Sequence, residues 1–409
     1  MPLRRRIRLF AIPGFLLCLS GAAAAQTAAP GPPADDGRAQ YPAILANSFV
    51  SINVGSIGYA FSDHQLEPGY QVESIAVPHV AVRAVLLGRH FGKYLSAQAT
   101  YMRPVRYVKY RNIAGHGTRS VWMHFGTVTM LARVPVSDRV SLSGEGGLAI
   151  TSRAGFEVGE APVVRDAHFS SLLVGAGVEY RVNRTWDLVA GAAYIPGRAR
   201  DRQPATTLTS AGFRYNMRPL PEAQVAATRA AGFIFPKQTI QFGYTTNALG
   251  YRANHFVSKT VPIFWGGKVE VKRSTVNVQY QRNLFHTEKV FSIDVGARFG
   301  QWTSRNAGER FHTLAVYPLL RFTFLRLRPA DLYAAYSVAG PSYISRRVID
   351  GRQTGGHFTF QDFMAIGAFI GRGRHFNVEA ELNHYSNGNI LLENAGVKIP
   401  LTFKAGYAF

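Results

Sequence analysis

Residues 398–409, KIPLTFKAGYAF, carry the pattern that decides the fold. One parity of this stretch is apolar or aromatic and consists of Ile399, Leu401, Phe403, Ala405, Tyr407 and Phe409. The other parity includes Thr402, Lys404, Gly406 and Ala408. Because successive side chains of a β-strand point to opposite faces, this alternation predicts a strand with one apolar face. Alternating segments of about ten residues are typical of strands that cross a membrane in a barrel.

The same alternation recurs along most of the chain, in segments separated by short polar turns. In the first half, the candidate strands lie near 47–61, 79–91, 93–108, 119–134, 138–152, 168–182, 185–196 and 204–217. In the second half, they lie near 237–249, 268–285, 289–302, 311–326, 330–345, 357–370, 375–387 and 398–409. A soluble sandwich would use strands of about five or six residues. The length of the candidate strands therefore favours an all-β fold of the transmembrane antiparallel β-barrel type.

A break near the middle of the chain leaves two arrangements open. The stretch 219–236 is rich in Ala and Pro and lacks strand alternation, which predicts a linker with one helical turn. About eight strands on each side make two tandem barrels, whereas the same strands in one sheet make a single barrel of about sixteen. The expected division is a signal peptide at 1–25, a disordered lead-in at 26–45, an N-terminal barrel half at 46–218, the linker at 219–236 and a C-terminal barrel half at 237–409.

The first residues predict export. Four arginines precede an apolar stretch at 9–19, and small residues suited to cleavage follow at 23–25. This is the layout of a secretory signal peptide, and the apolar stretch is too short for a retained spanning helix. Export together with barrel strands predicts the outer membrane of a Gram-negative bacterium. The aromatic pair Tyr407 and Phe409 resembles the terminal signature read by the outer-membrane assembly machinery, which is therefore an expected partner.

The composition narrows the classes of function. The one cysteine, Cys18, lies in the predicted signal peptide, so disulfides, thiolate metal sites and cysteine catalysis are excluded for the mature chain. The histidine spacing suggests no metal site, and no cofactor is expected. The formal net charge of +22 suggests an anionic partner. For an exported barrel, the phosphates of lipopolysaccharide fit better than nucleic acid. The alternative is that the arginines only line the loops and the lumen.

The stretch 383–388, NHYSNG, contains the candidate chemistry. The strand that leads into it has an apolar parity formed by Phe376, Val378, Ala380 and Leu382. His384 and Ser386 continue this parity, so both are expected to face lipid. Polar groups are costly on that face unless they serve a purpose. Since the last strand of such a barrel runs toward the periplasm, this pair is expected at the extracellular end, in the outer leaflet.

The preceding strand offers an acid. Its more apolar parity consists of Phe358, Phe360, Met364, Ile366, Ala368 and Ile370, and Asp362 shares it. If the register keeps both apolar faces outward, Asp362 falls opposite His384. Directly paired side chains lie about 4.5–5.5 Å apart, close enough for a carboxylate to orient an imidazole. A slip of one residue would remove the contact.

These residue types suit nucleophilic catalysis. A serine hydroxyl becomes a good nucleophile when a histidine accepts its proton, and a carboxylate fixes the tautomer of that histidine. Asn387 and Gly388 follow the serine and are placed to stabilise an oxyanion. The alternative interpretation is that His384 and Ser386 are ordinary polar residues of a barrel rim.

The C-terminal half, roughly 237–409, resembles the PagL-type lipid A 3-O-deacylases. His384, Ser386 and Asn387 carry the resemblance, followed by a loop with Asn394 and Gly396. The stretch Phe360-Gln361-Asp362 also resembles a family segment on the strand before. The resemblance implies an eight-stranded outer-membrane hydrolase that acts on lipid A of lipopolysaccharide. It further implies that Ser386 is the nucleophile, His384 the general base and Asn387 an oxyanion contributor.

One position departs from the family. The family's acid, a glutamate, falls at Lys398 in this sequence. Glu393 in the same loop, or Asp362 across the ladder, is the candidate replacement. The leading interpretation is an outer-membrane serine esterase that removes the 3-O-linked acyl chain of lipid A. The competing interpretation is a non-enzymatic barrel, porin-like or structural, whose catalytic triad has decayed.

Overall fold

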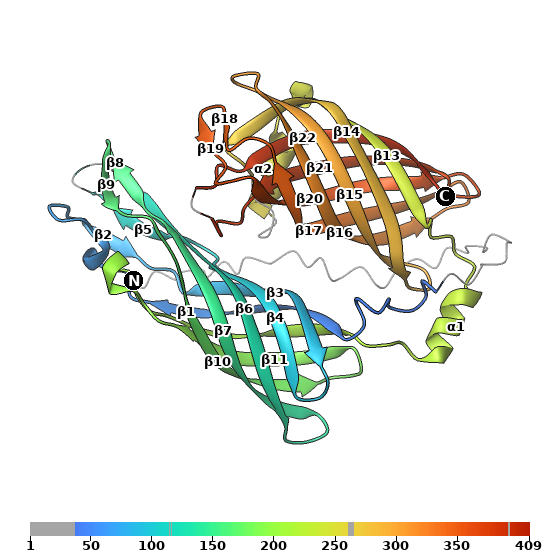
Figure 1. Ribbon diagram of the computed structural model, residues 1–409, viewed down its shortest axis with the longest axis horizontal. Helices are drawn as coiled ribbons and strands as arrows, with labels where there is room; N and C mark the ends of the chain where they lie inside the picture. Colours follow the sequence, from blue (N-terminus) through green and yellow to red (C-terminus); the bar gives the residue numbers. More distant parts are fainter. Residues whose placement is uncertain (1–36, 114, 116, 261–265, 392) are drawn as a thin grey trace, which may run out of the picture.

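The computed structural model describes residues 37–113, 115, 117–260, 266–391 and 393–409, and it contains two closed antiparallel barrels of eight strands each in that part of the chain. Figure 1 shows one barrel in blue to green and the other in yellow to red. They are called barrel 1 and barrel 2 below. Of the two expected arrangements, the tandem one is therefore confirmed. Among the described residues, no helix has the length and apolar character needed to span a membrane. The predicted signal peptide lies outside the described residues.

Barrel 1 runs from residue 48 to residue 217. Its strands, in chain order, are β1 (Ser48–Tyr59), β3 (Val80–Phe91), β4 (Leu95–Pro104), β6 (Arg119–Pro135), β7 (Val140–Ala154), β10 (Ala167–Arg181), β11 (Trp186–Ile195) and β12 (Thr206–Met217). Each strand pairs with the next in this order, and the pairing of β12 with β1 closes the barrel. Short additions at one end are β2 (Ser74–Ala76), β5 (Val108–Arg111), β8 (Phe156–Val158), β9 (Ala161–Val164) and the 3-10 turns η1 (Asp63–Gln65) and η2 (Ala199–Asp201).

Barrel 2 runs from residue 238 to residue 408. Its strands are β13 (Gln238–Thr245), β14 (Val269–His286), β15 (Phe291–Ser304), β16 (Arg310–Arg326), β17 (Ala330–Ile344), β20 (Phe358–Ile370), β21 (Phe376–Ser386) and β22 (Val397–Ala408). The pairing of β13 with β22 closes the barrel. Because β13 is short, β14 and β22 also meet directly above it, in parallel. The loops carry η3 (Asn247–Leu249), α2 (Arg252–Thr260), β18 (Val348–Ile349) and β19 (Arg352–Gln353).

The connection between the barrels is more structured than the sequence suggested. The helix α1 (Glu222–Ala230) occupies the predicted linker and is longer than the single turn expected there. The described part of the predicted disordered lead-in is folded as well. Arg38 donates to the Oδ1 atom of Asn283 at 2.8 Å, and the ring of Tyr41 stacks on Phe285 at 4.2 Å. The segment before β1 therefore contacts barrel 2.

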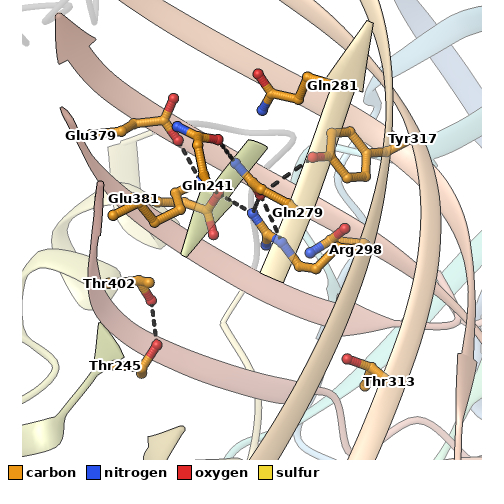
Figure 2. Close-up of polar contacts among 12 residues, drawn as sticks. Gln241, Thr245, Gln279, Gln281, Arg298, Thr313, Tyr317, Glu379, Glu381 and Thr402 are labelled. Carbon is orange, nitrogen blue, oxygen red and sulfur yellow. Dashed lines mark hydrogen bonds and ion pairs between the residues drawn. The ribbon is translucent and has the colours of Figure 1, made fainter. Parts of the chain in front are cut away.

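The lumen of barrel 2 is filled by charged and amide side chains. Figure 2 shows Arg298, Gln279 and Glu381 meeting there, with Arg298 ion-paired to Glu381. Lys404 also pairs with Glu381, at 2.5 Å. These residues are the polar parity of their strands, so the apolar parity, such as the exposed Phe403 and Tyr407, faces outward. The alternation predicted for residues 398–409 is thus confirmed for these strand positions.

The loops fix the orientation of barrel 2. Its end near Phe409 has the short connections 287–290, 327–329 and 371–375. Its opposite end has longer connections, at 246–268, 345–357 and 387–396. Outer-membrane barrels have short periplasmic turns and longer extracellular loops. Ser386, the last residue of β21, therefore lies at the extracellular end.

The lumen network yields a prediction about stability. Arg298→Ala removes one of the two cations that neutralise Glu381 inside the barrel, with Lys404 left as the other. Because an incompletely paired buried charge is strongly destabilising, the free energy of unfolding should fall by about 3 kcal/mol. Urea unfolding of the purified barrel in detergent, followed by its gel mobility, measures this change. The exposed Lys272→Ala is the matched control and should stay within about 0.5 kcal/mol of the wild type; equal midpoints for both variants would refute the assignment.

Candidate active site

The hairpin of β20 and β21 positions the candidate catalytic residues. A tight turn at 371–375 joins the two strands, with Gly371 at φ 90° and Arg374 at φ 60°. The register pairs Asp362 directly with His384, as the outward placement of both apolar faces required. The Oδ2 atom of Asp362 lies 3.5 Å from the Nε2 atom of His384. Ser386 is the next residue of β21 on the same face.

A bulge in β17 holds the carboxylate. The register of β17 with β20 shifts between Ser337 and Gly340, and Ala339 within this bulge has a φ of 51°. The backbone N–H of Ala339 donates to the Oδ1 atom of Asp362 at 2.6 Å. Bulges commonly re-aim backbone or side-chain groups beside functional sites. Here the bulge leaves the second carboxylate oxygen, Oδ2, directed at His384.

The pair lies on the predicted face but does not contact lipid freely. Lower on the same outward face, Val378 is 44% exposed and Ile366 is 65% exposed. At the extracellular end, His384 is 0% exposed and Ser386 is 9% exposed. The expectation that both residues contact lipid is therefore corrected, because other parts of the protein cover this end of the hairpin.

The loop after Ser386 is fastened by Asn387. The Nδ2 group of Asn387 donates to the carbonyl of Glu393 at 2.9 Å and to that of Thr354 at 3.2 Å. Its backbone N–H donates to the Oδ1 atom of Asn394 at 3.1 Å. The N–H groups of Asn387 thus hold the loop in place. The next residue, Gly388, has a φ of 63°, a left-handed conformation that favours glycine.

Glu393, the other candidate acid, lies in the loop after Ser386. It is exposed there and has a φ of 59°. Its backbone carbonyl, rather than its carboxylate, accepts the bond from Asn387. Asp362, in contrast, forms an ion pair with His384.

On the other side of β21, the strand register places Lys398 of β22 opposite His384. Neighbouring side chains neutralise the charge of Lys398. Its Nζ atom lies 3.1 Å from the Oε1 atom of Glu270 and 2.9 Å from the Nε2 atom of His255. Its Nζ atom also lies 5.3 Å from the ring centroid of Tyr251. Burial raises the pKa of the Tyr251 hydroxyl to about 12, so this residue stays neutral. Sequence reasoning missed Glu270, whose proximity depends on the parallel pairing of β14 with β22.

The residue types of the site suit hydrolytic chemistry. Among the residues that the structure describes, no group of three or more His, Cys, Asp or Glu side chains comes together as a metal site. Acid, imidazole and hydroxyl, in contrast, lie in one row on adjacent strands. This is the set of groups that a serine esterase requires.

Part of the chain is similar to a family of known proteins. Residues 274–399 match the family model described as lipid A 3-O-deacylase (PagL). The matched region runs from β14 into β22 and includes Asp362, His384 and Ser386. No curated protein sequence matches the chain.

Solved outer-membrane barrels resemble one half of the chain. The crystal structure of the outer membrane enzyme PagL is 14% identical, with a TM-score of 0.27, over 42% of this chain and 98% of that one. The N-terminal β-barrel domain of Pseudomonas aeruginosa OprF is 12% identical, with a TM-score of 0.27, over 42% and 98%. Neisserial surface protein A is 16% identical, with a TM-score of 0.26, over 42% and 97%. The chain is thus an outer-membrane barrel protein of a Gram-negative bacterium whose C-terminal barrel is similar, over residues 274–399, to the lipid A 3-O-deacylase (PagL) family.

Proposed function

We propose that the protein is a serine esterase that removes the 3-O-linked acyl chain of lipid A, with Ser386, His384 and Asp362 as its triad. The observation that carries the proposal is the direct pairing of Asp362 with His384, 3.5 Å apart, with Ser386 next on the same face. The extracellular position of this row supports a lipid of the outer leaflet as substrate. The match of this region to the lipid A 3-O-deacylase family supports lipid A in particular.

The reaction proceeds through an acyl-enzyme. His384 accepts the proton of the Ser386 hydroxyl as its oxygen attacks the ester carbonyl. The tetrahedral intermediate collapses, and the 3-hydroxyl of the sugar leaves with the proton held by His384. Water then attacks the acyl-serine with His384 again as base, which releases the fatty acid and restores Ser386. Asp362 faces one ring nitrogen throughout and stabilises the imidazolium.

The loop after the nucleophile supplies the oxyanion donors in this proposal. Because the side chain and backbone N–H groups of Asn387 already donate within the loop, Asn387 contributes by fixing the loop. The backbone N–H of Gly388 is then the donor directed at the developing charge. One such donor contributes about 10²–10³ in kcat.

Asp362 replaces the acid that the family carries at the position of Lys398. A lysine there would disfavour an imidazolium on His384 if its charge were uncompensated. Glu270 and His255 bind its ammonium group instead. The acid role and the neutralisation of Lys398 are thus provided by two different strands, β20 and β14.

Exposed arginines favour a phosphorylated lipid at this end. Arg346, Arg347 and Arg352 lie in the extracellular connection between β17 and β20, and all three are exposed. Guanidinium groups bind phosphate oxygens in bidentate fashion. The phosphates of lipid A would meet these side chains while the acyl ester reaches the hairpin.

Lipid A mass spectrometry tests the enzymatic proposal. Cells that make the wild type should lose one hydroxyacyl chain from lipid A, and cells that make Ser386→Ala should lose none. Asp362→Asn should lower the rate by about 10²–10⁴, because the histidine loses its orienting carboxylate. Glu393→Gln is the matched acid-to-amide control and should act like the wild type. Identical lipid A from the wild type and Ser386→Ala would contradict the proposal.

The porin-like alternative makes a different prediction. Charged side chains such as Arg298 and Glu381 fill the lumen of barrel 2, and a cavity of about 60 Å³ lined by Arg83 and Glu145 lies within barrel 1. In the described residues, paired charges thus occupy both lumens, so planar bilayers with the purified protein should show no porin-sized conductance. Stable conductance steps as large as those of a general porin would favour the pore over the enzyme.

A further inference from the structure

Barrel 1 touches the loop that directly follows the candidate nucleophile. The Nδ2 atom of Asn389, in this loop, lies 3.3 Å from the Nδ1 atom of His124 on β6. A Cβ atom added to Gly126, also on β6, would lie 3.6 Å from the Cγ1 atom of Ile390. The two barrels are therefore in van der Waals contact beside the site.

Tyr101 of barrel 1 lies at the same place. Its Cε2 atom would lie 4.0 Å from a Cβ atom added to Gly388, and its ring stacks on His124 with centroids 5.8 Å apart. Tyr101 thus packs on His124 and lies beside the loop that follows Ser386.

These residues come from the outward face of barrel 1. Tyr101 and Gly126 are direct neighbours across the pairing of β4 with β6. Val128 and Met130 continue the outward pattern of β6 and are 63% and 44% exposed. Two surfaces of the lipid-facing kind therefore meet at one end of the molecule. We call this meeting of β4 and β6 with the β20–β21 hairpin and its loop the seam.

The seam lies at the end of the β20–β21 hairpin where the outward-facing side chains become buried. Lower positions on the outward face of the hairpin, such as Ile366, are open, whereas His384 is fully covered. Tyr101, His124 and Gly126 of barrel 1 lie against residues 388–390, the loop that directly follows Ser386. Barrel 1 therefore borders the covered end of the hairpin through this loop.

We infer that the acyl chain of the ester substrate binds in the seam, with Tyr101 and Gly126 of barrel 1 as the wall opposite Ser386. This inference rests on the proposed esterase function and adds a role for the first barrel. The hydrophobic effect favours an acyl chain between two apolar surfaces, because both are then removed from polar surroundings. Gly126 has no side chain, and a Cβ atom there would already be in van der Waals contact with Ile390, so a larger residue would narrow the seam.

The contacts elsewhere permit the seam to open without separating the barrels. At the periplasmic end, the segment before β1 fastens barrel 1 to barrel 2 through the stacking of Tyr41 on Phe285 and the bond from Arg38 to Asn283. At the seam, the Asn389–His124 pair, 3.3 Å apart, is a polar contact between the barrels. An acyl chain can replace van der Waals contacts there while the far end stays joined.

A reversible disulfide across the seam tests the inference. Cys18 is the only cysteine in the sequence and lies in the predicted signal peptide, so introduced pairs are free of competing thiols. Gly126→Cys with Ile390→Cys places two thiols at the contact where a Cβ atom added to Gly126 would lie 3.6 Å from the Cγ1 atom of Ile390. Ala132→Cys with Ile390→Cys is the matched control, because Ala132 is exposed on the same face of β6 but away from the seam.

The first measurement uses the full-length protein with Ser386→Ala, so that substrate is bound without being consumed. Oxidation should close the Gly126/Ile390 pair at least about tenfold faster than the control pair. Lipid A in the micelles should slow this closure at least about threefold, whereas its deacylated, still phosphorylated sugar should not. A pair that fails to close, or closure unaffected by lipid A, would overturn the inference, as would equal protection by the deacylated sugar.

The second measurement separates this inference from the proposed function. With Ser386 intact, the disulfide-closed protein should deacylate lipid A at least about tenfold more slowly than the same protein after reduction. Equal rates before and after reduction would refute the seam as the binding site. If lipid A protects the pair but no reduced protein deacylates it, the esterase proposal fails while lipid binding in the seam stands.

Discussion

The pairing of β20 with β21 is the constraint on which the candidate site depends. One register places Asp362 opposite His384, directs both outward and puts Ser386 on the same face. A slip of β20 by one residue would send the acid to the lumen and leave the imidazole alone on the outward face. The short turn at 371–375 and the lumen pairing of Glu379 and Glu381 with Lys404 hold this register, since a slip would move these charges to the apolar side.

Polar groups are paired on both the inner and the outer face of barrel 2. Inward, charged residues neutralise one another, with Arg298 and Lys404 on either side of Glu381. Outward, the strands carry apolar residues until the extracellular end, where polar groups appear on adjacent strands. The bulge at Ala339 directs one oxygen of Asp362, and Glu270 takes the charge of Lys398. The polar groups at the extracellular rim thus have nearby partners, which lowers the free-energy cost of placing such groups at a membrane surface.

Much of this arrangement could be predicted from the sequence, because alternation with a period of two encodes both strand and face. The sixteen barrel strands and the register of Asp362 with His384 follow from it. The way in which the barrels close does not follow from the alternation, since the same strands could form one barrel or two. The parallel contact of Glu270 with Lys398 arises only because β13 stops at Thr245. The contact of barrel 1 with the loop after Ser386 was also missed, because an apolar face shows the same pattern whether it meets lipid or protein.

The central claim is that Ser386 is a nucleophile activated by His384 and oriented through Asp362. Labelling of the purified protein with a fluorophosphonate, followed by mass spectrometry of its peptides, measures that reactivity directly. The account predicts an adduct on Ser386 that forms in the wild type and at least about tenfold more slowly in Asp362→Asn. An unlabelled Ser386, or the same labelling rate in both proteins, would contradict it.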